Sequence, residues 1–562
     1  MRREVSVVNK KVCSFPILFA LLALLIGTCA VVFPASAQAA PTSTGSITVS
    51  GTVARSYDAF QIFSANVVDG DSDAKIATDL AWASDAARDA VLPVLHSAGM
   101  PNSQTTAQEA AEWLNTDSHL TSALSAQLAR SLQGSDAESV ALNAGTTAEL
   151  SCGYWLIVAD DAAIAEGEAG TAPIMVLVGG SAVTVKPKAA TPKVTKHVLE
   201  DGTAAWQKAA DATVGDDLYW RLSATVPAGL TAYDTYTVRF VDTMSAGLDS
   251  SKVVASMRVY VAVGTDGGFD AVSAGKDGRA GTEPAKGWTD ITAQCATKVA
   301  ADGTFTVRTG DLIAALGGAD AFTAGARVVA VYNAPLNSAC NHGIAKGNPN
   351  EVYLRYPRSP FADQSGDAGF THTPSDDACA YTWDLALTKR GSDGDKPLAG
   401  AVLSIADDRG RTLSADGTWD AEGKATVTTG EDGRVTVSGV DSGKLEVREL
   451  KAPKGYTAFE GARSVTVKSE GLDVDQVAAA KPKLTITAES PLRADSADGS
   501  TGSLEASLIN TPTGTPPSIT AGGFMPSTGD MAMYAAAAAA VAGAALIVVA
   551  LLVKRGGGSH KE

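Results

Sequence analysis

The chain is poor in the residues on which metal centres, hydrolytic enzymes and nucleic-acid-binding proteins depend. It has only six histidines in 562 residues, and none of its six cysteines belongs to a Cys-x-x-Cys pair, so we expect no metal site. A Gly-x-Ser-x-Gly elbow and a phosphate-binding glycine loop are also missing, and we expect no cofactor. Acidic residues outnumber basic ones by 62 to 45, which argues against nucleic acid as a partner. The sequence therefore favours a protein that is not an enzyme acting on an external substrate.

Strand-forming and turn-forming residues are abundant instead. The chain has 55 glycines and many Thr, Val and Ser residues, which predict short strands and turns rather than long helices. Its length is enough for about three or four domains. We therefore expect a mainly β protein with several domains in tandem.

The first 39 residues have the layout of a secretory signal peptide. A basic start is followed by an apolar stretch over residues 15–33 and then by small residues, and we expect cleavage after Ala37 or Ala39. An uncleaved N-terminal anchor is the alternative. Four cysteines remain after cleavage, and in an exported chain they permit two disulfides with three possible connectivities: Cys152, Cys295, Cys340 and Cys379.

The last forty residues combine a short motif, an apolar run and a basic tail. The uncharged run from Met531 to Val553 is long enough to cross a bilayer as a helix, and the basic tail would stay in the cytoplasm. In front of the run stands the pentapeptide Met525, Pro526, Ser527, Thr528 and Gly529.

This order resembles the cell-wall sorting signal of Gram-positive surface proteins, with Met525 at the Leu position of Leu-Pro-x-Thr-Gly. The resemblance implies that a sortase cuts between Thr528 and Gly529 and transfers the Thr528 carbonyl to an amine. An ordinary membrane anchor behind a chance motif is the alternative. We assign residues 525–562 to the sorting signal and residues 513–524 to a linker, because the latter are rich in Pro and Gly and lack a core pattern.

Residues 40–188 are expected to form a first β domain with a helical insertion. Strands are predicted at 46–49, 57–63 and 153–158. Between them, over 85–132, the spacing of the leucines at positions 120, 124, 128 and 132 predicts one face of a helix. Thr106 and Glu109 fit a helix capping box.

The end of this domain carries a second motif. Val183-Thr184-Val185 is followed by Lys186-Pro187-Lys188, and the run resembles the pilin motif of sortase-assembled pili, Trp-x-x-x-Val-x-Val-Tyr-Pro-Lys. Gly179 and Lys186 stand at the Trp and Tyr positions. The resemblance implies that Lys188 is the amine that captures Thr528 of the next subunit. A solvated interdomain lysine is the alternative, with Lys186 and Lys193 close by.

Residues 189–378 are expected to form an antiparallel β-sandwich without a long helix. Its segments 192–196, 240–248 and 347–356 resemble the isopeptide-forming D2 domain of Gram-positive fimbrial subunits. The resemblance implies that Lys196 attacks the side-chain amide of Asn350 and releases ammonia, with Asp242 assisting; Asn348 is the second choice for Asn350. Burial would lower the pKa of the lysine and raise that of the acid, as this reaction requires. A buried Lys–Asp ion pair near a turn asparagine is the alternative.

Residues 379–512 are expected to form a third domain, of the CnaB type. Residues 445–456 resemble the E-box of that family, Tyr-x-Leu-x-Glu-Thr-x-Ala-Pro-x-Gly-Tyr, with Leu at the first Tyr position and at the Thr position. The resemblance implies a bond between Lys389 and Asn510 that Glu449 catalyses. Strand alternation puts Val447 and Glu449 on one inward face. A surface glutamate before a Pro-Gly turn is the alternative.

Together these features resemble a Gram-positive sortase-assembled fimbrial subunit of the major pilin type, built from tandem immunoglobulin-like β-sandwiches of the CnaA and CnaB types. The resemblance implies a structural subunit of a covalently polymerised surface pilus that is anchored to the cell wall and supports adhesion. The implied partners are sortase, further copies of the chain, other pilin subunits, peptidoglycan and a host receptor. The alternative is a wall-anchored adhesin, or a tip or accessory subunit, that binds a host ligand without a linking lysine.

Overall fold

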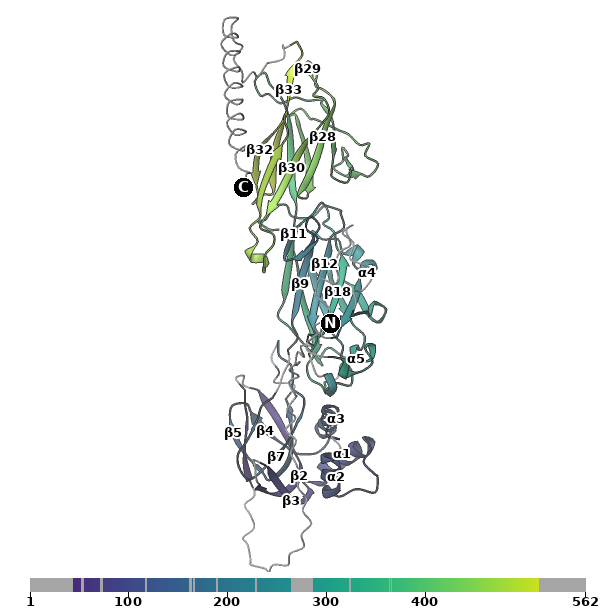
Figure 1. Ribbon diagram of the computed structural model, residues 1–562, viewed down its shortest axis with the longest axis vertical. Coiled ribbons are helices and arrows are strands. Elements are labelled where there is room, and N and C mark those ends of the chain that lie inside the picture. Colours follow the sequence, from purple (N-terminus) through teal and green to yellow (C-terminus); the bar gives the residue numbers. More distant parts are fainter. Residues whose placement is uncertain are drawn as a thin grey trace, which may run out of the picture.

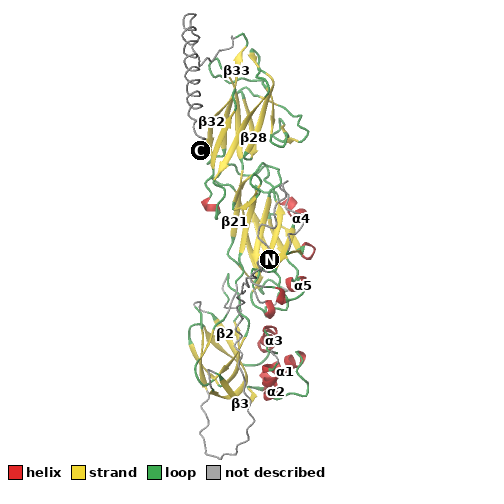
Figure 2. Ribbon diagram, in the orientation of Figure 1, coloured by secondary structure: helices red, strands yellow, loops and turns green. Residues whose placement is uncertain are grey.

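Three β units follow one another along an elongated molecule (Figure 1). The computed structural model describes residues 44–51, 55–70, 74–116, 119–160, 164, 167–187, 191–227, 230–263, 287–322, 325–362, 364 and 366–514. The expected signal peptide, Lys188 and the sorting signal lie outside the described residues. Among these residues, helices are confined to the first unit and to short pieces elsewhere (Figure 2), so the expected mainly β fold is confirmed.

The first unit combines two sheets with a helical insertion. The smaller sheet has the order β5-β1-β8, and the larger one has the order β3-β2-β6-β7 with β4 also paired to β2. The strands are β1 Thr44–Val49, β2 Ser56–Asp69, β3 Lys75–Trp82, β4 Ser139–Asn143, β5 Thr147–Ser151, β6 Gly153–Ala159, β7 Ile174–Val178 and β8 Val183–Val185.

Three helices make up the insertion: α1 Asp85–Ser97, α2 Ala107–Asn115 and α3 Ser122–Gln133. The capping box at the start of α2 is confirmed, because Thr106 and Glu109 each bond the backbone N–H of the other. Leu124, Leu128 and Leu132 line the buried face of α3, as their spacing predicts. This face packs in one core with Phe60, Phe63 and other residues of the larger sheet.

The second unit is a β-sandwich of two sheets that share one core. One sheet has the order β10-β9-β12-β18-β14-β15, and the other has the order β11-β21-β19-β13-β17-β16 with β20 paired to β19. All pairs are antiparallel except β11 with β21. The strands of the first sheet are β9 Val194–Glu200, β10 Ala205–Gln207, β12 Tyr219–Thr225, β14 Arg258–Ala262, β15 Trp288–Asp290 and β18 Arg327–Asn333. Those of the second are β11 Ala209–Asp211, β13 Arg239–Met244, β16 Ala296–Val299, β17 Thr304–Arg308, β19 Asn348–Pro357, β20 Phe370–His372 and β21 Asp376–Tyr381.

Two short helices, α4 Val253–Ser256 and α5 Leu312–Ala315, also belong to the second unit. Trp220, Leu222 and Tyr332 belong to the core that the two sheets share, and the residues between them on β12 and β18 are buried as well. The sheet of the second unit extends through Tyr381, so the expected boundary at residue 378 falls inside β21.

The third unit is a second sandwich, and its first and last strands are neighbours. One sheet has the order β27-β22-β33-β29 with β32 paired to β33, and the other has the order β25-β24-β23-β28-β30-β31 with β26 paired to β23. The strands of the first sheet are β22 Trp383–Gly391, β27 Arg434–Val440, β29 Tyr456–Thr457, β32 Leu492–Asp498 and β33 Ser503–Pro512. Those of the second are β23 Val402–Ala406, β24 Thr412–Leu413, β25 Trp419–Asp420, β26 Val427–Thr428, β28 Gly443–Lys451, β30 Ala462–Glu470 and β31 Lys483–Ala488. The strands β22 and β33 run parallel.

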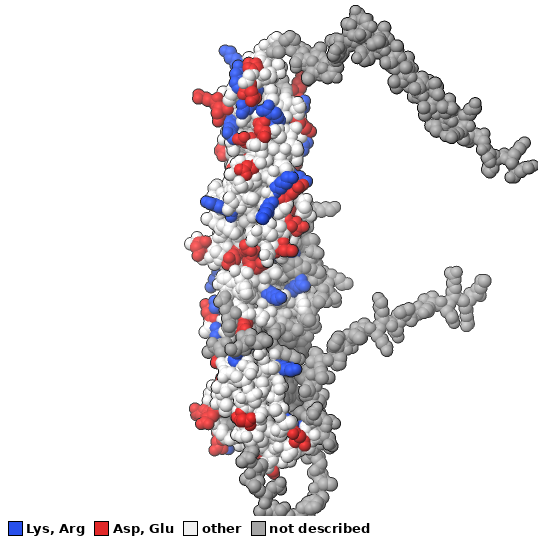
Figure 3. All heavy atoms as spheres, turned by 90° about the vertical axis from the view of Figure 1, so that its left-hand side faces the viewer, with Lys and Arg blue, Asp and Glu red and all other residues white. Residues whose placement is uncertain are grey.

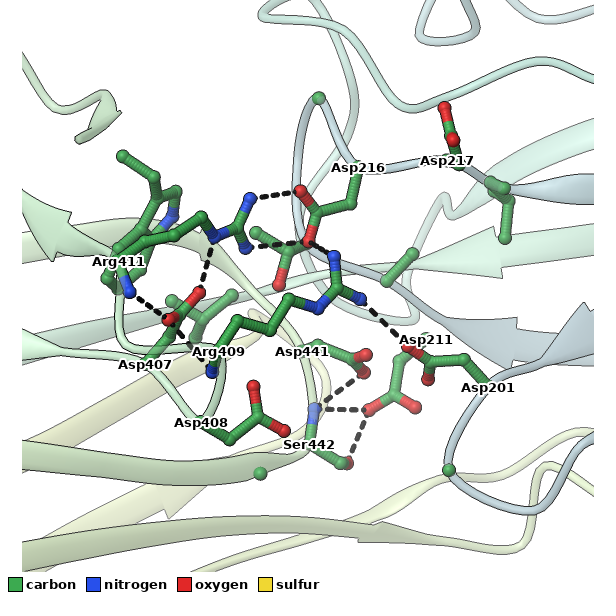
Figure 4. A pocket seen from close by; sticks show the side chains of 18 of the residues that line it. Asp201, Asp211, Asp216, Asp217, Asp407, Asp408, Arg409, Arg411, Asp441 and Ser442 are labelled. Atoms are coloured by element: carbon green, nitrogen blue, oxygen red, sulfur yellow. Dashed lines mark hydrogen bonds and ion pairs between the residues drawn. The ribbon is translucent and has the colours of Figure 1, made fainter. Parts of the chain in front are cut away.

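Polar contacts join the second and third units. Asp211 of β11 accepts hydrogen bonds from Trp383 Nε1 at 2.7 Å and from the hydroxyls of Ser442 and Ser469 at 2.5 and 2.7 Å. Arg411 donates to both oxygens of Asp216 at 2.5 and 2.8 Å, along one wall of the pocket between the units (Figure 4). Burial raises the pKa of Asp441 in this pocket well above its usual value. The two sandwiches are therefore fastened together by hydrogen bonds and an ion pair.

All four cysteines after the signal peptide are free thiols: Cys152, Cys295, Cys340 and Cys379. The sequence permits two disulfides, and the structure forms neither of them. Burial raises the pKa of the thiols of Cys295 and Cys379 to about 11, so both remain protonated and unreactive at neutral pH.

Charges of both signs are interspersed along the face drawn in Figure 3, and no continuous basic stripe crosses the described part of that face.

Candidate functional site

A lysine, a glutamate and an asparagine meet in the core of the third unit. Lys389 and Asn510 lie on the neighbouring strands β22 and β33, and Asn510 is opposite Gly391, two residues beyond Lys389. Glu449 reaches them from β28 in the other sheet. All three side chains are buried. Glu449 is inward because β28 alternates, as the sequence predicts for Val447 and Glu449.

Direct contacts connect all three groups of this site. Lys389 Nζ contacts Asn510 Oδ1 and lies 3.1 Å from Glu449 Oε1. Asn510 Nδ2 donates to both carboxylate oxygens of Glu449, at 2.8 and 3.0 Å. Burial lowers the pKa of Lys389 to about 8, although the charge of Glu449 opposes this shift. Near neutral pH, Lys389 can therefore lose its proton while its Nζ contacts the side-chain amide of Asn510.

The second unit has a corresponding group of four side chains. Lys196 lies on β9 of one sheet, whereas Asp242 and Asn350 lie on the adjacent strands β13 and β19 of the other. Asn350 pairs with Met244, two residues from Asp242, so both side chains point to the same inner face. Lys196 forms an ion pair with Asp242, and both side chains are fully buried.

The fourth member is Tyr332 of β18, which the sequence did not suggest. Its hydroxyl accepts hydrogen bonds from Lys196 Nζ at 2.9 Å and from Asn350 Nδ2 at 2.8 Å. It donates to Asp242 Oδ2 at 3.1 Å. Tyr332 thus stands between the amine and the amide.

The electrostatics of this site favour a proton shared between the lysine and the acid. Burial lowers the pKa of Lys196 to about 8 and raises the pKa of Asp242, and the attraction between the two charges opposes both shifts. Two buried oxygens, Asp242 Oδ1 and Asn350 Oδ1, have no hydrogen-bond partner. A buried acceptor without a donor is unfavourable, and a proton on Asp242 Oδ1 would turn that oxygen from an acceptor into a donor.

The amides of Asn348 and Asn350 have different surroundings. Asn348 is equally buried, but its Nδ2 donates to the backbone oxygens of Asn341 and Ala380, at 2.9 and 3.2 Å. Its Oδ1 accepts from Asn341 N at 2.8 Å. Asn348 therefore fastens the start of β19, and Asn350 is the asparagine beside Lys196 and Asp242.

Comparison with known proteins finds a family model that matches part of the third unit. Residues 384–481 match the family model described as SpaA, prealbumin-like fold domain. This segment of the third unit is therefore similar to a SpaA-type prealbumin-like domain. It contains Lys389 and Glu449, whereas Asn510 lies beyond the match.

One curated relative is the trypsin-resistant surface T6 protein of Streptococcus pyogenes serotype M6, which is 31% identical over 134 residues. The alignment covers 22% of this chain and 23% of the relative, so the chain spans about a quarter of the relative's length.

Two solved structures are also similar. They are the T6 backbone pilin of Streptococcus pyogenes, with 17% identity and a TM-score of 0.47, and the major pilin SpaD of Corynebacterium diphtheriae, with 14% identity and a TM-score of 0.40. Each match covers 84% of this chain, with 100% of the T6 structure and 97% of the SpaD structure.

Two aromatic residues that contact the reactive groups, Phe459 and Tyr332, were not predicted from the sequence. In the prealbumin-like domain, Phe459 donates its backbone N–H to Glu449 Oε2 at 3.2 Å and holds its ring 5.9 Å from Lys389 Nζ. Phe459 follows Tyr456, the last residue of the E-box-like segment, by three residues, so it could have been suspected. Tyr332 has no comparable sequence signal, because it lies on a β strand outside all three D2-like segments.

The end of the first unit carries the residues next to the expected linking lysine. Strand β8 pairs parallel with β1, with Val183 opposite Ile47 and Val185 opposite Val49. Lys75 Nζ donates to the backbone oxygens of Gly179 and Ser181, at 2.5 and 2.7 Å, and so holds the turn before β8. Lys188 and Thr528 lie outside the described residues. Within the described residues, no helix is long and apolar enough to span a membrane, and no group of three or more His, Cys, Asp or Glu is arranged to hold a metal.

Proposed function

We propose that this chain is the structural subunit of a covalently polymerised cell-surface pilus, in which two intramolecular isopeptide bonds stiffen the second and third units. The observation that carries this proposal is the burial of two complete sets of lysine, acid and asparagine in successive sandwiches. In this reading the second unit is of the CnaA type and the prealbumin-like unit is of the CnaB type. The proposed bonds join Lys196 to Asn350 and Lys389 to Asn510.

The chemistry of each bond is an exchange of one amide for another. A neutral lysine Nζ attacks the Cγ carbon of the asparagine, the Cγ–Nδ2 bond breaks, and ammonia leaves. The buried acid, Asp242 or Glu449, holds a proton that polarises the amide carbonyl during the attack. In the second unit burial lowers the pKa of Lys196 and raises that of Asp242, which supports both requirements. In the third unit burial lowers the pKa of Lys389, which supports the requirement for a neutral amine.

The bonds would restrict the unfolded chain as a disulfide does. Each closes a loop of more than a hundred residues, for which chain entropy gives about 4–5 kcal/mol if an amide link behaves like a disulfide. Unlike a disulfide, the amide resists reductants. This suits a chain whose four described cysteines remain unpaired.

Polymerisation is the second part of the proposal. A sortase cuts between Thr528 and Gly529 and joins Thr528 to Lys188 of the next subunit, and the last subunit is transferred to peptidoglycan. The matches to the SpaA-type domain and to the T6 surface protein support this role. The precursor would be held briefly in the membrane by the apolar run from Met531 to Val553.

The test is electrophoresis of wall extracts in sodium dodecyl sulfate, from cells that express the chain with its cognate sortase. The expected result is a high-mass ladder that collapses with Lys188→Ala. Lys186→Ala and Lys193→Ala are the matched controls, because both lysines are exposed and close in sequence, and both variants should keep the ladder. A single wall-released band from the native chain would contradict polymerisation and favour a monomeric adhesin or tip subunit. A ladder that survives Lys188→Ala would assign the linkage to another amine.

A further inference from the structure

The hydroxyl of Tyr332 connects the two nitrogens that exchange places in the proposed bond of the second unit. It lies 2.9 Å from Lys196 Nζ, the attacking nitrogen, and 2.8 Å from Asn350 Nδ2, the leaving nitrogen. The ring of Tyr332 is fixed by a T-shaped contact with Phe305, at 4.8 Å between centroids. The hydroxyl is therefore held in place by the core.

Bulk water does not reach this site. Lys196, Asp242, Asn350 and Tyr332 are each 0% exposed. The exchange of amides nevertheless requires that one proton leave Nζ and one proton join Nδ2, because the product nitrogen keeps one hydrogen and ammonia carries three. A protein group must therefore carry the proton.

The acid of this site contacts only one of the two nitrogens directly. Asp242 Oδ2 contacts Lys196 Nζ and the Tyr332 hydroxyl, whereas the hydrogen bond described for Asn350 Nδ2 goes to Tyr332. In the third unit, Glu449 alone contacts both Lys389 Nζ and Asn510 Nδ2. The carboxylate thus has the contacts of a proton carrier in the third unit, and the tyrosine has them in the second.

We propose that Tyr332 is a catalytic residue of the second unit, whose hydroxyl relays the proton from Lys196 Nζ to Asn350 Nδ2. The inference rests on the isopeptide bond proposed above. Nζ forms a bond to Cγ of Asn350 and gives a proton to the tyrosine oxygen, which gives its own proton to Nδ2. The Cγ–Nδ2 bond breaks and ammonia leaves. When the step starts from neutral Lys196 and protonated Asp242, Tyr332 and Asp242 end in the protonation states in which they began, so no further reactant is needed.

The relay requires only a small rearrangement of the hydroxyl. In the structure its hydrogen points to Asp242 Oδ2, and rotation about the C–O bond can turn it to Nδ2, since the position of a hydroxyl hydrogen adapts to its partners. This rotation becomes favourable when Asp242 is protonated, because Asp242 then no longer requires the hydrogen bond from the Tyr332 hydroxyl. The acid's proton can then lie on Asp242 Oδ1, an oxygen that has no hydrogen-bond partner in the structure.

The test compares Tyr332→Phe with the native chain. The rate at which the Lys389–Asn510 bond forms in the same molecule serves as the internal reference. The full mature chain is synthesised in a cell-free system, samples are quenched in urea at intervals, and peptide masses report each bond separately. The relay predicts that the Lys196–Asn350 bond forms about 100-fold more slowly or worse in Tyr332→Phe, as is typical of lost acid–base catalysis. The Lys389–Asn510 bond should form at the native rate.

Equal rates for the second-unit bond in the native and phenylalanine chains would overturn the relay and leave the isopeptide proposal intact. Absence of that bond from the native chain would instead overturn the isopeptide proposal itself. If Tyr332→Phe does not fold, judged by circular dichroism, 3-fluorotyrosine at position 332 carries the test, because it keeps the hydroxyl and changes its acidity. The relay then predicts a changed ratio of second-unit to third-unit rates, and an unchanged ratio contradicts it.

Discussion

The second and third units contain the same kinds of reactive side chains in opposite arrangements. In the third unit, Lys389 and Asn510 share one sheet and Glu449 reaches them from the other. In the second unit, the acid and the asparagine share a sheet and Lys196 comes from the other. A bond in the third unit therefore joins two neighbouring strands of one sheet, whereas a bond in the second unit joins the two sheets of the sandwich.

This difference changes what each bond would resist. The third-unit bond would hold the first and last strands, β22 and β33, against sliding past each other under tension. The second-unit bond would hold the two layers of the core together. The comparison suggests that the chemistry depends on burial and contact between three groups, and that the fold can deliver them from different strands.

The largest expected effect is the loss of one bond by replacing its lysine. We expect Lys389→Met to abolish the third-unit bond and Lys196→Met the second-unit bond, and each to lower the free energy of unfolding of its own unit by about 4–5 kcal/mol. Thermal unfolding followed by calorimetry measures this. The controls are Lys424→Met and Lys298→Met, at exposed lysines of the same units, and both should unfold as the native chain does. If either variant lowered the free energy of unfolding of both units equally, the two bonds would not stabilise only the units that contain them.

A second prediction replaces the acids. In Glu449→Gln and Asp242→Asn the side chains keep their shapes but cannot donate the acid's proton, so we expect each bond to form at least 100-fold more slowly and only in the altered unit. Peptide masses at timed intervals check this. Bond formation at the native rate in Glu449→Gln would contradict a catalytic role for Glu449, despite its contacts with Lys389 and Asn510.

The pH dependence of the second-unit bond provides a third test. The reactive form, with neutral Lys196 and protonated Asp242, carries as many protons as the ion pair, so the rate should be level while the pair holds one shared proton. Above the lysine pKa of about 8 that proton is lost, and the rate should fall about tenfold per pH unit. At low pH both groups are protonated and the rate falls again. The rate at each pH is measured by quenching samples of freshly folded chain at intervals and determining the masses of their peptides. A rate that keeps rising above pH 8 would indicate that a free amine alone is sufficient.

The smallest expected effect concerns the junction between the two units. Arg411→Met removes a partly buried ion pair with Asp216, and we expect a loss of about 1 kcal/mol in the coupling between the units. Calorimetry should then show two unfolding transitions that lie further apart than in the native chain. Lys444→Met, at an exposed lysine of the same unit that pairs with Glu446, is the control. Unchanged transitions would show that the contacts of Asp211 with Trp383 and Ser442 suffice.

Much of the fold could be predicted from the sequence, because strand alternation and helical spacing depend on local pattern. The capping box of α2, the buried leucines of α3 and the inward direction of Glu449 all follow from such patterns. The lysine, acid and asparagine of each site were instead implied by the resemblance to isopeptide-forming domains. Tyr332 could not be found in this way, because its role depends on where a third strand lies in the sandwich. Alternation also could not separate Asn348 from Asn350, since both point inward and differ only in the partners of their amides.

The measurement that tests the central claim most directly is the intact mass of the mature chain under denaturing, reducing conditions. The account predicts a mass lower than that of the plain sequence by two molecules of ammonia, one for each bond. It also predicts two branched peptides after proteolysis, which join Lys196 to Asn350 and Lys389 to Asn510. A mass equal to that of the plain sequence would contradict both bonds, and the two buried sets would then be ion pairs beside an asparagine.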